Sequence, residues 1–145
     1  MAEPSTNELR IRLVTPVRTL VEACAASVEL PAKNGYMEVL YGHAPLLSEL
    51  GAGDVRIHGC TGSGAAAEQI YNVNWGFVEV LPDRVTILAN DALKPEEIDA
   101  NRAQQQLDKG HKLWNEAGES EEAYEHALAV IAEAESKVAT AAEKR

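Results

Sequence analysis

Apolar and polar residues alternate along the first part of the chain, as they do in strands that bury one face. Leu9, Ile11 and Leu13 alternate with Arg10 and Arg12, for example. Further short apolar or alternating runs lie at residues 28–30, 37–41, 55–57, 70–74, 76–81 and 85–89. Turn-forming sequences separate the runs, and spacing of about 8–12 residues is typical of an all-β sandwich or barrel.

The period changes near residue 93, where glycine and β-branched residues give way to alanine, glutamate and glutamine. Pro95 and the acidic residues after it are suited to the first turn of a helix, because that turn needs no N–H and favours negative charge. Apolar residues then recur at helical spacing as far as Trp114.

Gly118 interrupts this helix, and Ser120 is a suitable N-cap for a second one. Two amphipathic helices joined by a short loop predict an antiparallel hairpin. The fold class is therefore an all-β N-terminal sandwich or barrel followed by an α-helical antiparallel hairpin. We expect the β-domain over residues 1–93 and the helical domain over residues 94–145. The apolar stripes are rich in alanine, which suits a mobile regulatory arm and an ordinary helical appendage equally well.

Charge and composition exclude several classes of function. The formal net charge is −10 over 145 residues, which argues against nucleic-acid binding because phosphate contacts need an excess of Lys and Arg. No apolar run reaches the ~20 residues of a membrane span, so we expect any membrane association to come through partners. Cys24 and Cys60 show no CxxC spacing, so a reducing compartment is expected.

Sequence motifs of enzymes are missing as well. None of the four histidines has a second histidine four residues away, so we expect no metal site. No GxSxG, phosphate-binding glycine loop or dinucleotide fingerprint occurs. We therefore expect no catalytic residues and no resident cofactor, although a pair of scattered carboxylates acting as a small active site stays open as an alternative.

The segment Gly42, His43, Ala44, Pro45 and Leu46 is the most distinctive in the chain. Glycine permits a turn, and proline fixes its own φ and favours an extended residue before it. This segment is either a rigid corner between strands or a surface loop that meets a partner.

Several segments, in this order, resemble the epsilon subunit of F-type ATP synthase. They are 14–16, 30–31, 37–40, 42–47, 76–80, 85–89 and 96–99, and they extend over most of the chain. The resemblance implies a non-catalytic central-stalk subunit that couples rotation of the rotor ring to ATP synthesis, driven by protons or sodium ions. It implies a sandwich bound to the gamma subunit and a loop, Gly42 to Leu46, that faces the ring of c subunits. The resemblance implies that the C-terminal helices either fold against the sandwich or extend to the alpha/beta catalytic hexamer. The complex would lie at the cytoplasmic face of a bacterial inner membrane.

Some family members bind regulatory ATP through a motif that Ile98, Asp99, Arg102 and Ala103 match here. The second helix offers few basic residues for phosphate, so we expect no ATP binding, and Asp99 and Arg102 would equally suit a local ion pair. From Glu119 onward the chain has seven acidic and three basic residues. Inhibition of ATP hydrolysis by this arm is therefore expected to be weak.

Two positions depart from the family pattern: Trp75 stands where glycine is common, and Tyr41 stands where proline is common. The main alternative to the stalk subunit is a sandwich-plus-hairpin adaptor of another protein assembly.

Overall fold

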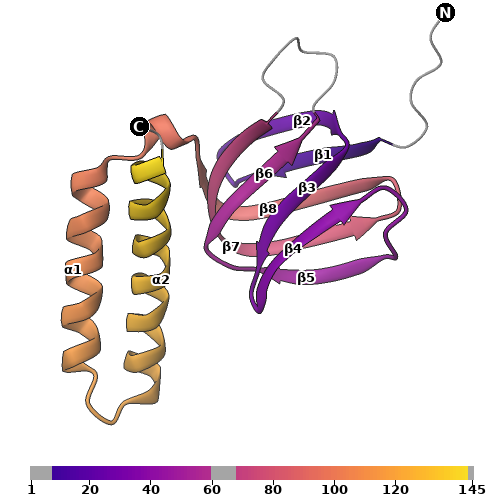
Figure 1. Cartoon of the computed structure of the whole chain (residues 1–145). Coiled ribbons are helices and arrows are strands. Elements are labelled where there is room, and N and C mark those ends of the chain that lie inside the picture. Colours follow the sequence, from indigo (N-terminus) through magenta and orange to yellow (C-terminus); the bar gives the residue numbers. More distant parts are fainter. Residues whose placement is uncertain (1–7, 60–67, 144–145) are drawn as a thin grey trace, which may run out of the picture. The chain divides into compact units, whose positions relative to one another are not determined.

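The computed structural model describes residues 8–59 and 68–143. The chain divides into two compact units, Met1–Ala92 and Leu93–Arg145, which we call the sandwich unit and the hairpin unit. The first contains strands and the second contains helices (Figure 1). The predicted fold class is confirmed.

The strands of the sandwich unit form one continuous, folded-over sheet around an apolar core (Figure 1). They are β1 (Leu9–Val14), β2 (Thr19–Ala25), β3 (Ser27–Ala32), β4 (Gly35–Leu40), β5 (Leu46–Leu50), β6 (Gly53–His58), β7 (Glu68–Leu81) and β8 (Arg84–Leu93). Their order is β2-β1-β8-β7-β5-β3-β4, and β6 pairs with both β3 and β7. Strand β1 pairs with β8, and the two strands run parallel. This pairing makes neighbours of two segments that are far apart in sequence.

Strand β1 shows how the alternating pattern builds the core. Leu9, Ile11 and Leu13 are almost fully buried, whereas Arg10 and Arg12 point to the opposite face and are exposed. Because side chains alternate across a strand, this register places one whole face of β1 in the core. The core also contains side chains from every other strand, among them Val28, Leu30, Val39, Leu50, Val55, Ile57, Val73, Val78, Val80, Val85 and Ile87.

Strand β7 bends at Trp75 and Gly76, and the bend lets it pair with two different strands. Its first half pairs with β6 and its second half with β5. Trp75 has φ 49° and Gly76 has φ 129°, both in the region that favours glycine. A Cβ on Gly76 would overlap the carbonyl oxygen of Leu88 on β8. The expected two separate runs at 70–74 and 76–81 are therefore one bent strand, and Trp75 occupies a backbone conformation suited to glycine.

Two strands have no counterpart in the sequence prediction. In β2 the core-facing residues Val21, Ala23 and Ala25 alternate, but two of them are alanine and the apolar Cys24 lies between them, which weakens the pattern. In β5 only Leu50 is buried. Without a clear period-2 signal these segments are not recognisable as half-buried strands.

The hairpin unit contains a 3-10 turn, η1 (Pro95–Glu97), and two helices, α1 (Ala100–Glu116) and α2 (Glu121–Glu143). The expectation that Pro95 opens the first α-helix is wrong, since α1 begins only after Asp99, which caps it. The cap predicted at Ser120 is confirmed, because its Oγ accepts from the backbone N–H of Ala123 at 3.2 Å.

Small residues lie in the seam between the two helices. Buried small residues of the hairpin unit include Ala103 and Gly110 of α1, Ala117 at its C-cap, and Ala127, Ala134 and Ala141 of α2. A Cβ on Gly110 would lie 2.8 Å from Ile131 Cγ1 and 3.3 Å from the Ile131 backbone nitrogen, so glycine allows a close approach of α2 at this position. The larger side chains Trp114 and Tyr124 contact each other, with ring centroids 6.1 Å apart, but remain 45% and 41% exposed.

Candidate functional site

The segment between β4 and β5 is held by backbone hydrogen bonds to a neighbouring turn. The N–H of Gly42 donates to the carbonyl of Pro82, in the turn between β7 and β8, at 2.7 Å. The N–H of His43 donates to the carbonyl of Leu40 at 3.3 Å. Gly42 has φ 90°, which explains why glycine is suited to this position. The segment is therefore a fixed corner at one end of the sandwich.

The His43 side chain reinforces this corner. Its Nδ1 lies 2.7 Å from the carbonyl oxygen of Ala44, and because a carbonyl only accepts, Nδ1 carries the proton of this bond. The next residue is Pro45, whose ring fixes φ and disfavours helical geometry at Ala44. Together these features restrict the backbone conformations open to the loop.

Exposed apolar side chains flank the corner. Leu40 and Tyr41 precede it, Leu46 is its last residue and Leu47 follows it; Leu47 is 71% exposed. Clusters of exposed apolar residues typically mark interaction sites. The two interpretations of this segment, rigid corner and partner-facing loop, are therefore compatible: the backbone is a fixed corner, and its apolar side chains are available to a partner.

The residues of the ATP motif lie at the start of α1. Ile98 is buried, and Asp99 is exposed and caps the helix: its Oδ1 accepts from the backbone N–H groups of Asn101 at 3.0 Å and Arg102 at 3.2 Å. Ala103 is buried, while the Arg102 side chain is exposed. The alternative ion pair between Asp99 and Arg102 is not formed among the described residues.

A polar network on strands β3, β6 and β7 was not anticipated from the sequence. His58 Nε2 lies 3.0 Å from Glu29 Oε2, and its Nδ1 lies 3.5 Å from Glu68 Oε2. Arg56 donates to Glu68 at 3.0 Å and also faces Asp54, 3.8 Å away. These residues lie on strands paired with one another, so the network depends on sheet order, which the sequence pattern does not reveal. Such partly exposed pairs contribute little stability each.

No group of three or more His, Cys, Asp or Glu residues is arranged to hold a metal ion within residues 8–59 and 68–143. In the same part of the chain, no helix combines the length and apolar character needed to cross a membrane. Cys60 and the rest of the glycine- and alanine-rich segment 60–67 lie outside the described residues.

Comparison with known proteins gives consistent results. The model of the β-sandwich domain of the ATP synthase delta/epsilon chain matches residues 8–95. The ATP synthase epsilon chain of Solibacter usitatus (strain Ellin6076) is 39% identical over 142 residues, which are 97% of this chain and 99% of the relative. The epsilon chain of Koribacter versatilis (strain Ellin345) is 47% identical over 95 residues, covering 64% of this chain and 62% of the relative.

A solved structure shares the fold. It is a chain in the assembly of the Euglena gracilis mitochondrial ATP synthase, described as OSCP/F1/c-ring in rotational state 1. The two chains are 20% identical with a TM-score of 0.72, and the match covers 94% of this chain and 81% of that one. The resemblance inferred from the ordered motifs is confirmed by the family model and the relatives. The chain belongs to the family of ATP synthase epsilon chains, which are non-catalytic subunits of that complex.

Proposed function

We propose that this chain is a central-stalk rotor subunit that couples rotation of the c-subunit ring to ATP synthesis, driven by protons or sodium ions. The observation that carries the proposal is the fixed corner at residues 42–46 with its exposed leucines, in a chain of the epsilon family. A rotor subunit has to transmit torque, so a partner-facing loop held by hydrogen bonds suits it better than a loop free to move.

The rotor ring is the proposed partner of this corner. Leu47→Glu would place a charge on the most exposed leucine beside it, and we expect at least tenfold weaker binding to the purified c ring of the same source. Val17→Glu is the matched control, because Val17 is also highly exposed but follows β1 rather than the corner. Equal loss of binding in both variants would contradict a specific role for the corner.

The gamma subunit is the proposed partner of the sandwich unit. Mixing the full chain with gamma from the same source should give a stable 1:1 complex in size-exclusion chromatography at micromolar concentration. Two separate peaks would instead support the alternative, a sandwich-plus-hairpin adaptor of another assembly.

We propose that the C-terminal helices contact the alpha/beta hexamer but inhibit ATP hydrolysis only weakly. Glu121 and Glu122 begin α2, and the last turn of this helix has no basic residue. Ending the chain after Leu93 should therefore change the ATPase activity of the assembled complex by less than twofold. A several-fold rise in hydrolysis would show that the arm is inhibitory.

Regulatory ATP is not expected to bind at Ile98, Asp99, Arg102 and Ala103. The carboxylate of Asp99 already caps α1, and Ala103 is buried in the helix seam, which leaves the Arg102 side chain as the available group. Calorimetry with millimolar ATP should give the same result for the wild type and for Arg102→Gln, and saturable heat that this substitution abolishes would contradict the expectation. The proposed location is the cytoplasmic face of a bacterial inner membrane, reached through partners, as the bacterial relatives support.

A further inference from the structure

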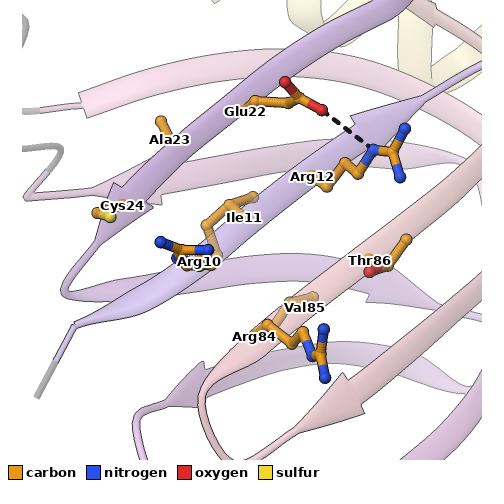
Figure 2. Close-up of a pocket in the computed structure, with 9 residues that line it drawn as sticks. All are labelled: Arg10, Ile11, Arg12, Glu22, Ala23, Cys24, Arg84, Val85 and Thr86. Carbon is orange, nitrogen blue, oxygen red and sulfur yellow. Dashed lines mark ion pairs between the residues drawn. The ribbon is translucent and has the colours of Figure 1, made fainter.

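Three arginines share one face of the sheet at an open groove. Arg10 and Arg12 on β1 and Arg84 on β8 are exposed, while Ile11 and Val85 between them point into the core. Figure 2 shows the groove across strands β2, β1 and β8. Its volume is about 480 Å³, and Glu22, Cys24 and Thr86 also line it. That volume is within the range of small-molecule sites.

The register of β1 and β8 places two of these arginines side by side. Arg10 pairs with Arg84 and Arg12 with Thr86 in the parallel ladder. Neighbouring strands are about 4.8 Å apart, so the side chains of Arg10 and Arg84 start from adjacent positions on the same face. Like charges in direct cross-strand contact are unfavourable. The fold does not need this pair, because both side chains lie outside the core.

Nearby carboxylates neutralise the arginines unequally. Arg12 Nε lies 3.3 Å from Glu22 Oε1, an ion pair visible in Figure 2. Arg84 Nε lies 3.8 Å from Asp83 Oδ1, at the edge of an ion-pair contact. No ion pair to Arg10 occurs among the described residues. The groove is therefore locally positive in a chain whose formal net charge is −10.

We propose that this groove binds a compact anion with at least two phosphate groups. Guanidinium groups bind phosphate oxygens in a bidentate manner and stay charged at any physiological pH. Arg10 and Arg84 would hold adjacent phosphates, and the Thr86 hydroxyl would donate a further hydrogen bond. The groove leaves room beyond a diphosphate, so the ligand is either a soluble phosphorylated compound or a lipid headgroup.

Calorimetry of the full chain with sodium pyrophosphate at 0.15 M ionic strength tests the proposal. The double variant Arg10→Gln/Arg84→Gln should bind at least tenfold more weakly than the wild type. Lys33→Gln/Lys112→Gln is the matched control, since it removes the same charge from exposed positions that do not line the groove. The control should bind within twofold of the wild type. Backbone amide shifts in NMR spectra should change near residues 10, 24 and 84.

A further variant tests whether removing a negative charge from the groove strengthens pyrophosphate binding. Glu22→Gln releases Arg12 from its carboxylate and should tighten pyrophosphate binding several-fold. Sedimentation with vesicles containing phosphatidic acid distinguishes the two sources of the ligand. Retention that depends on Arg10 and Arg84 would support a lipid headgroup, and pyrophosphate binding without retention would support a soluble compound.

Two results would overturn the proposal. One is no pyrophosphate binding by the wild type at 1 mM, a concentration at which a site of even millimolar Kd, about −4 kcal/mol, is half filled. The other is equal binding by the groove variant and the lysine control, which would show only a response to net charge. In the first case, binding of polyglutamate would identify an acidic protein surface as the partner instead.

Discussion

Replacing Gly76 by alanine tests whether the bend in β7 is fixed by the absence of a side chain. At φ 129° a residue with a Cβ is strained, at a cost of about 1–3 kcal/mol. The added Cβ would also overlap the carbonyl oxygen of Leu88 and lie 3.2 Å from Ala89 Cα. Both atoms belong to the backbone of β8, so the strands have to move apart, which costs about another 1–3 kcal/mol. We therefore expect Gly76→Ala to lower the free energy of unfolding by about 2–6 kcal/mol.

Gly35→Ala separates the two contributions. Gly35 has φ 135°, close to that of Gly76, but a Cβ there meets no atom within 4 Å. Only the conformational cost of about 1–3 kcal/mol should remain. The difference between the two variants then measures the overlap with β8.

Urea unfolding of the full chain, followed by circular dichroism in the far ultraviolet, gives both free energies. A loss of 3 kcal/mol lowers the midpoint by about 1–3 M urea, given slopes of about 1–3 kcal/mol per molar. If Gly76→Ala proves no less stable than Gly35→Ala, then β8 accommodates the methyl group, and the steric account of the bend is wrong.

Three further predictions concern other contacts. Gly110→Leu should force α1 and α2 apart and lower the free energy of unfolding by about 1–3 kcal/mol, measured by the thermal loss of helical dichroism, while Gln105→Leu on the exposed side of α1 should have little effect. Asp99→Ala should destabilise α1 by about 1 kcal/mol, and Asp99→Asn should retain most of the capping; equal thermal melting curves for Asp99→Ala and the wild type would refute the capping role. Arg56→Gln should cost about 1 kcal/mol or less in urea unfolding, because Arg56 and its nearer partner Glu68 are partly exposed, and a loss well above that would reveal a stronger contribution from the buried Asp54.

The sequence predicted the parts of the fold that depend on local pattern. The alternation in β1 and the polar cap at Ser120 follow from one strand or one helix end, and the structure has both. Strand β5 was missed because Leu46 and Leu47 are both exposed, so its apolar residues do not mark a buried face. The start of α1 was misplaced because Pro95 also suits the 3-10 turn that precedes the helix.

Of the candidate sites too, some could be predicted from local sequence and others depend on which strands are paired. The corner at residues 42–46 is visible in sequence because glycine and proline act on their own backbone. The arginine groove depends on the parallel pairing of β1 with β8, which joins Arg10 to a residue more than seventy positions away. The contacts of His58 with Glu29 and Glu68 depend likewise on which strands are neighbours. Side-chain periodicity identifies the buried face of a strand but not the strand beside it.

In the hairpin unit, the apolar residues of each helix are divided between the buried seam and the exposed surface. On each helix the sequence gives a single band of apolar residues, but the structure divides it by size. Small residues seven positions apart, such as Ala103 and Gly110, form the buried seam, and this spacing returns to nearly the same side of a helix. Trp114 and Leu128 are displaced from the seam and remain 45% and 44% exposed. Gly110 leaves room in the seam for the Ile131 side chain of α2, whereas Trp114 and Leu128 remain outside it as exposed apolar groups.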